Sequence, residues 1–261
     1  MKKIWRKLFL PACFSLTVTT GCANSEEQTE LSYVKTGNLD SNYRIIFIHG
    51  SPGNKEAYDA YLEHPELNRQ VEMVSVDRLG YGVNQGTVET SLLNQARSIL
   101  PFLSEDKNNI LVGHSLGSPI ALQLALLAPE KVAGMVLIAS AFDPELEHPK
   151  WYNQVADTVV AKWILPTDMN NSNEEMMVLS KELSLIAGQD WSVLKIPIDI
   201  VHGNEDELAY FGNAVFAYEK LSPNGATLSV LKGEGHLVLW QNTELVTDEI
   251  LQMLSQLEQR Q

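Results

Sequence analysis

The sequence predicts an α/β domain built on a doubly wound, mostly parallel sheet with helices on both faces. Apolar runs of strand length alternate along the chain with amphipathic, helix-like segments. The runs consist largely of Val, Ile and Leu, as in strands that are covered on both faces. With 261 residues and 44% apolar composition, the chain can bury one substantial core, so we expect a single main domain.

Seven short apolar runs are expected to form the strands of this sheet. They are residues 31–35, 44–48, 71–76, 110–112, 133–139, 198–201 and 227–231.

Five helix-like segments lie between or after these runs. Pro101 predicts a kink in the second of them, and Pro129 ends the third, because proline removes a backbone donor and crowds the preceding turn. The five segments are residues 51–67, 91–104, 118–127, 211–221 and 244–258.

Residues 141–197 contain no strand-like run and are expected to form a small helical lid insertion. The capping-box pattern Ser172–Glu175 predicts the start of one helix, which Gly188 can end. The Trp and Met residues of the segment have two interpretations, packing onto the main domain or an apolar roof over a cleft. An earlier helix is indicated by apolar residues that recur every four positions, namely Trp151, Val155, Val159 and Trp163.

The N-terminus has the pattern of an export signal. Residues 1–7, MKKIWRK, are basic, and the apolar stretch that follows is too short to span a bilayer as a stable helix. We expect a signal peptide over residues 1–21, a flexible tether over 22–30 and the folded domain over 31–261. The domain is therefore expected to be exported to the cell envelope.

The sequence TTGC at Thr19–Cys22 resembles the lipobox of bacterial lipoproteins, although the family usually has an aliphatic residue where Thr19 stands. The resemblance implies lipidation of Cys22 and a membrane-anchored domain that faces the periplasm or the exterior. An ordinary signal peptide cleaved nearby, or an uncleaved anchor, is the alternative. Cys13 would leave with the signal peptide, so we expect no disulfide in the mature domain.

The net charge of −14 becomes −18 if the four basic residues of the N-terminal head are removed. Such a surface repels nucleic acid phosphates, so no nucleic acid partner is expected. The oligomeric state is left open.

A serine flanked by glycines, Gly113–Gly117 (GHSLG), stands between an expected strand and an expected helix. Side chains two positions either side of a serine in such a strained turn would collide with the turn, and glycine removes the collision. The turn presents the hydroxyl above the sheet and leaves N–H groups at the helix start. GHSLG resembles the nucleophile elbow of the α/β-hydrolase family, which implies that fold and makes Ser115 the nucleophile.

The family order of nucleophile, acid and histidine implies the remaining catalytic residues. Of the three histidines after Ser115, His236 follows the last expected strand on a glycine-rich loop and matches the catalytic histidine. His148 lies in the insertion, and His202 ends a strand and is interpreted as structural.

The family acid follows Gly203 by three residues, which implies Asp206. The sequence ELAY after it departs from the usual hydrophobic residue and proline, which leaves the shape of this loop open. Asp143 is the second choice for the acid, and Glu205 and Glu207 are interpreted as surface residues.

The resemblance also implies two backbone donors for an oxyanion. One is the N–H of Leu116, directly after the nucleophile. The other is the N–H of Ser51, in the sequence FIHGSPG at 47–53, which is similar to the family's His-Gly-x-Pro-Gly loop. We expect His49 to brace this loop, and we interpret DRLGYG at 77–82 as structural.

Together these residues imply a serine hydrolase acting on carboxylic esters or related acyl bonds of a small molecule, without a metal or other cofactor. Serine at the elbow excludes the haloalkane dehalogenases and epoxide hydrolases of the family, which use aspartate there. Peptidase, thioesterase, C–C hydrolase or cofactor-free haloperoxidase chemistry, and a non-catalytic ligand-binding lipoprotein, stay as alternatives.

Overall fold

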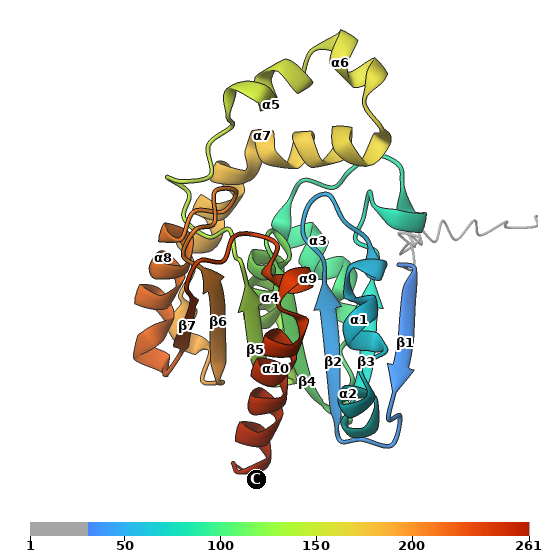
Figure 1. Cartoon of the computed structure of the whole chain (residues 1–261), viewed down its shortest axis with the longest axis vertical. Helices are drawn as coiled ribbons and strands as arrows, with labels where there is room; N and C mark the ends of the chain where they lie inside the picture. Colours follow the sequence, from blue (N-terminus) through green and yellow to red (C-terminus); the bar gives the residue numbers. More distant parts are fainter. Residues whose placement is uncertain (1–30, 261) are drawn as a thin grey trace, which may run out of the picture.

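A computed structural model describes residues 31–260, which form a seven-stranded sheet with helices on both faces (Figure 1). The expected signal peptide and tether, including Cys22, lie outside the described residues. The strand order is β1-β3-β2-β4-β5-β6-β7, and all pairs are parallel except β1 with β3. The strands are β1 Tyr33–Gly37, β2 Tyr43–Ile48, β3 Glu72–Val76, β4 Asn108–His114, β5 Val132–Ile138, β6 Ile198–Gly203 and β7 Thr227–Leu231. All seven expected strands are confirmed, with boundaries that differ by a few residues.

Two hydrophobic cores separate the helices by face of the sheet. One core joins the sheet to helices α3 (Leu92–Ile99), α4 (Gly117–Leu127) and α8 (Gly212–Leu221). The other joins it to α1 (Asp59–Leu62), α2 (Pro65–Gln70), α9 (Val238–Gln241) and α10 (Thr243–Glu258). β2, β4 and β5 contribute to both cores, as their continuous apolar sequence predicts.

Prolines explain how two expected helices divide. The segment expected as one helix over 51–67 forms a 3-10 helix, Lys55–Tyr58, and the two short helices α1 and α2. α2 starts anew because Pro65 takes its first position and holds His64 in an extended conformation. After α3, the kink expected at Pro101 is a 3-10 turn, Leu100–Phe102.

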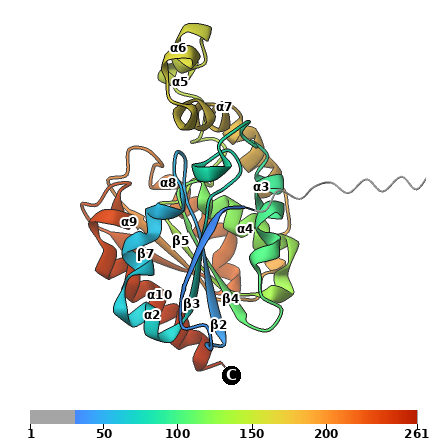
Figure 2. The same ribbon diagram turned by 90° about the vertical axis from the view of Figure 1, so that its right-hand side faces the viewer.

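Residues 141–197 contain three α-helices, which lie above the carboxyl ends of the parallel strands (Figures 1 and 2). They are α5 (Trp151–Ala156), α6 (Val159–Ile164) and α7 (Thr167–Ala187). The single helix indicated by the four-residue repeat is wrong, because Thr158 is extended and its side chain accepts from Ala161 N–H as the N-cap of α6. α7 ends before Gly188, as expected.

The capping box predicted at Ser172–Glu175 is also wrong, because α7 begins five residues earlier, after Pro166. The four side chains lie inside the helix, and three of them, Ser172, Asn173 and Glu175, are buried. Glu175 contacts Arg78 of the main domain, and Asn173 donates to the Asn153 carbonyl on α5. The pattern that resembled a helix start is a set of buried polar contacts.

Of the two interpretations of the Trp and Met residues, packing onto the main domain holds for the buried Trp191, and Met169 and Met176 line a pocket. Neither interpretation holds for Trp151 and Trp163. Trp151 and Trp163 are 75% and 88% exposed, and Val155 and Val159 are exposed as well. In the part of the chain that the structure describes, no helix is long and apolar enough to cross a membrane.

Candidate active site

Ser115 lies in the sharp turn between β4 and α4. Its φ is +53°, in the left-handed region that residues with a side chain rarely adopt, and its N–H donates to the Ile138 carbonyl at 2.9 Å. A Cβ at Gly113 would lie 2.6 Å from the Gly117 carbonyl oxygen, and a Cβ at Gly117 would overlap the Ile48 carbonyl oxygen. Glycine is therefore required on both sides of this turn.

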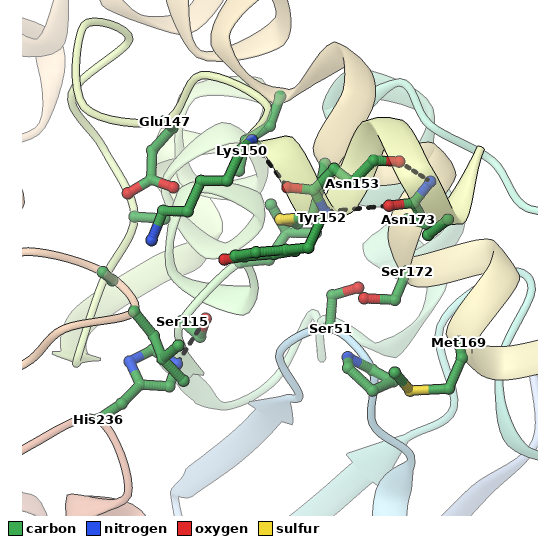
Figure 3. Close-up of a pocket in the computed structure, with 18 of the residues that line it drawn as sticks. Ser51, Ser115, Glu147, Lys150, Tyr152, Asn153, Met169, Ser172, Asn173 and His236 are labelled. Atoms are coloured by element: carbon green, nitrogen blue, oxygen red, sulfur yellow. Dashed lines mark hydrogen bonds between the residues drawn. The ribbon is translucent and has the colours of Figure 1, made fainter. Parts of the chain in front are cut away.

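The three residues predicted as a catalytic set form one chain of hydrogen bonds. His236 follows β7, and its Nε2 lies 3.1 Å from Ser115 Oγ. Its Nδ1 lies 2.8 Å from Oδ2 of Asp206, which follows β6. With the serine hydroxyl donating to Nε2, we assign the ring proton to Nδ1, where it is donated to the carboxylate. Figure 3 shows Ser115 and His236 facing each other at the base of a pocket.

The Asp206 side chain is buried and accepts hydrogen bonds at both oxygens. Oδ1 accepts the backbone N–H groups of Leu208 and Ala209, at 2.8 and 2.9 Å. Oδ2 lies 3.3 Å from Nε2 of His202, in addition to its bond with His236. Burial alone would raise the pKa of Asp206, but the hydrogen bonds from the two histidines outweigh it and hold the pKa well below the usual value. The carboxylate is therefore ionised at neutral pH.

The sequence ELAY at 207–210, which departs from the family pattern, has a direct structural role at the Asp206 carboxylate. Leu208 and Ala209 each supply a backbone donor to Asp206, which proline at either position could not do.

The remaining candidates for the acid, and His148, take no part in the hydrogen bonds that join Ser115, His236 and Asp206. Asp143 Oδ1 accepts the N–H of Glu145 at 2.9 Å within its own loop. Glu205 and Glu207 are exposed. His148 lines the pocket, with Nε2 3.8 Å from a carboxylate oxygen of Glu145.

Two buried histidines support the site and were not predicted to do so. His202 donates from Nε2 to the Ala209 carbonyl at 2.8 Å while facing Asp206. His114 bonds through Nε2 to the backbone carbonyl of His236 at 3.2 Å and holds that loop. Burial, together with the neighbouring His236, lowers the pKa of His114 to about 3, so its ring is neutral at physiological pH. The only sequence signal was their position at the ends of strands β4 and β6.

Ser51 and Leu116, the two expected oxyanion donors, line the same pocket as Ser115 and His236. A Cβ added to Gly50 would lie 2.9 Å from Ser115 Cβ, so the backbone just before Ser51 packs directly against the serine. Leu116 is buried at the start of α4.

The pocket has a volume of about 380 Å³ and is covered by residues of the 141–197 segment (Figure 3). One part of its wall is apolar and includes Leu165, Met169, Met176 and Leu179. Another part is polar and includes Glu147, Lys150, Asn153 and Asn173. The apolar roof expected from the sequence is therefore only one part of the wall.

Glu147 is a carboxyl group on the polar part of the pocket wall. Burial raises its pKa above the usual value, although Asn213 Nδ2 donates to it at 2.8 Å.

Comparisons with known proteins agree with this fold. The profile of the alpha/beta hydrolase family matches residues 45–249. A pimeloyl-[acyl-carrier protein] methyl ester esterase from Edwardsiella ictaluri is 31% identical over 97 residues, which cover 37% of this chain and 36% of the esterase. A 2-hydroxymuconate semialdehyde hydrolase from a Pseudomonas strain is 32% identical over 116 residues, 41% of each chain.

The matched segments span between 2% and 41% of the length of these and other curated relatives. Similarity to solved structures extends further along the chain. A lipase-esterase related protein from Clostridium acetobutylicum superposes with a TM-score of 0.69, covering 86% of this chain and 99% of that one at 18% identity. At that identity the likeness shows the fold alone.

Proposed function

The chain belongs to the alpha/beta hydrolase family, and within it we propose a serine hydrolase that cleaves carboxylic esters or related acyl bonds through an acyl-enzyme. The observation that carries the proposal is the hydrogen-bonded chain from Ser115 Oγ through His236 to the ionised Asp206. A serine hydroxyl is a poor nucleophile by itself, and this arrangement supplies both a base and a group that orients the base.

In the proposed reaction, Ser115 Oγ attacks the substrate carbonyl carbon as its proton passes to His236 Nε2. The Asp206 carboxylate stabilises the imidazolium and does not take the proton itself. The oxyanion of the tetrahedral intermediate accepts hydrogen bonds from the backbone N–H groups of Ser51 and Leu116. When the intermediate collapses, His236 protonates the leaving alkoxide. Water then attacks the acyl-enzyme and gives a proton to His236, which returns one to Ser115 Oγ as the acid departs.

The pocket favours a small or medium acyl ester, with an apolar group against Met169, Met176 and Leu179. The esterase relative supports an ester substrate, although the matched segment covers about a third of each chain. Esters with apolar acyl groups should therefore be cleaved faster than short charged esters, and the reverse preference would contradict this orientation.

The test is covalent labelling by a fluorophosphonate, which reacts with an activated serine. The wild-type protein should be labelled, and Ser115→Ala should not. Ser140→Ala is the matched control: Ser140 is buried two residues after the end of the neighbouring strand β5, and its hydroxyl has no hydrogen-bond partner in the described part of the chain. The proposal fails if folded wild-type protein takes no label, or if the label persists in Ser115→Ala.

A substrate panel that includes esters with short to long acyl chains and substrates for the alternative reactions, with His236→Ala as the inactive control, then identifies the reaction. Peptidase, thioesterase, C–C hydrolase and haloperoxidase chemistry use the same residues, and C–C cleavage has a specific reason to be included because one relative is a 2-hydroxymuconate semialdehyde hydrolase. A ligand-binding role would show as binding that survives Ser115→Ala with no turnover of any panel member.

We also propose that the domain is exported and anchored to a cell-envelope membrane through lipid on Cys22. This rests on the sequence alone. The Cys22→Ser variant should move from the membrane fraction to the soluble fraction, and unchanged membrane fractionation would contradict it.

A further inference from the structure

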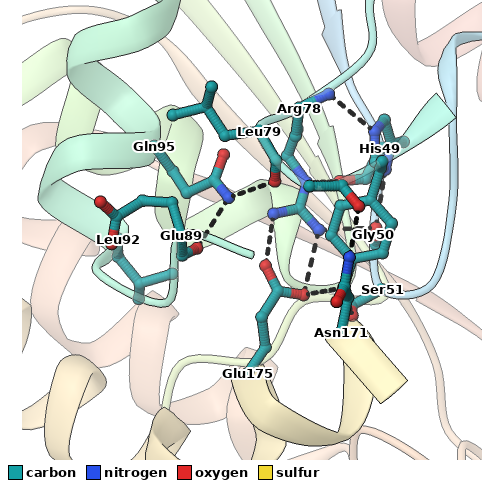
Figure 4. A network of polar contacts seen from close by, with 12 residues as sticks. His49, Gly50, Ser51, Arg78, Leu79, Glu89, Leu92, Gln95, Asn171 and Glu175 are labelled. Carbon is teal, nitrogen blue, oxygen red and sulfur yellow. Dashed lines mark hydrogen bonds and ion pairs between the residues drawn. The ribbon is translucent and has the colours of Figure 1, made fainter. Parts of the chain in front are cut away.

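Arg78 lies beneath the loop that carries Ser51 and is completely buried. Its Nε donates to the His49 carbonyl at 3.0 Å, and its Nη2 donates to the Gly50 carbonyl at 2.9 Å. Its backbone N–H donates to His49 Nε2 at 3.1 Å. Three donors of one residue thus hold the two residues that precede Ser51 (Figure 4).

Glu175, on α7 of the covering segment, pairs with this arginine and is itself buried. Its Oε1 accepts from Arg78 Nη1 at 2.7 Å, and its Oε2 lies 3.3 Å from Nη2. Tyr81 Oη donates to Oε2 at 2.5 Å and so can accept the Ser51 hydroxyl, 2.9 Å away. The carboxylate therefore fixes the guanidinium through Nη1 and Nη2, while Nε and Nη2 donate to the loop (Figure 4).

The peptide group between Gly50 and Ser51 receives the strongest restraint. Its carbonyl accepts from Arg78 Nη2 and also lies 2.8 Å from Nδ1 of His49. Because His49 Nε2 accepts the Arg78 N–H, the proton of this ring is on Nδ1 and is donated to that carbonyl. Burial and the nearby arginine lower the pKa of His49 well below its usual value, which keeps this neutral tautomer.

A trans peptide group is planar, so its N–H points opposite to its C=O. With the Gly50 carbonyl held toward Arg78, the Ser51 N–H is directed away from Arg78. Ser51 lines the pocket, and Gly50 packs against Ser115. Two donors on the carbonyl, one of them charged, also polarise the amide and strengthen its N–H as a donor.

We propose that Glu175, acting through Arg78, holds the Gly50–Ser51 peptide group in the orientation that presents the Ser51 N–H to the oxyanion. Arg78 and Glu175 are then positioning residues, and α7 supports the oxyanion hole as well as covering the pocket. The inference rests on the proposed function, because it assigns a support to one of its two oxyanion donors.

The main test uses two variants that separate positioning from stability. Glu175→Gln removes the charge with little change of shape. The double variant Arg78→Met with Glu175→Met replaces both charges by apolar groups, a change that often restores the stability lost when one partner of a buried pair is removed. Glu72→Gln is the matched control, because Glu72 is a buried carboxylate that pairs with three cations at the start of β3, the end of the strand remote from Ser115.

Both Glu175→Gln and the double variant should lower kcat/KM about 10- to 100-fold, less than loss of a whole oxyanion donor. KM should change little. The Ki of a trifluoromethyl ketone, whose carbonyl becomes an oxyanion when Ser115 adds to it, should rise by the same factor. Glu72→Gln should lower the melting temperature without changing kcat or this Ki. If the double variant regains wild-type kcat as well as stability, the proposal is overturned.

Amide hydrogen exchange of the loop 49–53 provides a readout that needs no activity. Glu175→Gln should speed exchange in this loop, and Glu72→Gln should leave it unchanged. An inactive, unlabelled wild-type protein would refute the proposed function, whereas unchanged loop exchange in Glu175→Gln would refute the positioning role alone.

Discussion

Replacing Asp206 by Asn tests the proposed catalytic chain with little change in shape. The Asn carbonyl oxygen can still accept the N–H groups of Leu208 and Ala209, as Oδ1 does now at 2.8 and 2.9 Å. The amide NH₂ then occupies the place of Oδ2 and faces His236 Nδ1, which lies 2.8 Å from that oxygen. Two donors cannot bond to each other, so the His236 proton moves to Nε2.

A proton on Nε2 makes the ring a donor toward Ser115 Oγ, 3.1 Å away, and the ring can no longer take the serine proton. In a triad of this kind the wrong tautomer lowers kcat by about 10⁴. That factor equals about 5 kcal/mol in the barrier. The backbone hydrogen bonds persist, so the cost in folding stability should be smaller, about 1–3 kcal/mol.

The difference in folding stability between wild type and Asp206→Asn should itself depend on pH. The pKa of Asp206 is lower in the folded protein than the unperturbed 3.8, so its ionised form stabilises the fold above that pH. This contribution is lost as the pH falls through the folded-state pKa. The gap in melting temperature between wild type and Asp206→Asn should therefore narrow below about pH 4.

The assay is ester hydrolysis by equal amounts of folded wild type, Asp206→Asn and the control Asp143→Asn. Asp143 was the second choice for the acid and bonds within its own loop, so its amide should retain nearly full kcat. Retention of a tenth or more of wild-type kcat by Asp206→Asn would refute the tautomer argument. A large loss in Asp143→Asn instead would move the acid to that residue.

Three further predictions concern the fold. Gly117→Ala should lower the free energy of unfolding by about 2 kcal/mol or more, because the new Cβ overlaps the Ile48 carbonyl oxygen; an unchanged urea midpoint would contradict this. Trp163→Ser should change that free energy by less than about 0.5 kcal/mol, since the side chain is 88% exposed, and a larger loss in urea titration would show unrecognised packing. Burial would raise the pKa values of Glu72 and Asp77, but their cation partners lower them below the usual values. The contribution of these carboxylates to folding stability is therefore present above their unfolded-state pKa values and is lost as the pH falls. Glu72→Gln should accordingly flatten the decline of the melting temperature below about pH 4, and an equally steep decline would count against this ion pair.

The sequence predicted the parts of the site that depend on local patterns. Ser115, Asp206 and His236 each stand just after an apolar strand, and the carboxyl ends of parallel strands meet at one edge of the sheet. The hydrogen bonds among them join residues 30 and 121 positions apart, and it was the resemblance to the family's order of nucleophile, acid and histidine that selected Asp206 and His236 among the residues after strands.

The support for the site depends on tertiary contacts that no local pattern records. Arg78 and Glu175 are 97 residues apart, one in a stretch interpreted as structural and the other in a supposed capping box. A capping box at the start of a helix and a set of buried polar contacts use the same residue types. The sequence Ser172–Glu175 was therefore wrongly predicted to be a capping box. Trp151 and Trp163 had the spacing of a buried helix face, but spacing does not show whether a neighbour covers that face.

The separation of Ser115 from Asp206 and His236 by the whole 141–197 segment has a consequence for refolding. β4 can pair with β2 from contacts made within the first half of the chain, but the acid and the base arrive only once β6 has docked on β5 and β7 on β6. During refolding from denaturant, ester hydrolysis should therefore not recover before β6 has paired with β5 and β7 with β6, so activity reports when these long-range pairings are complete.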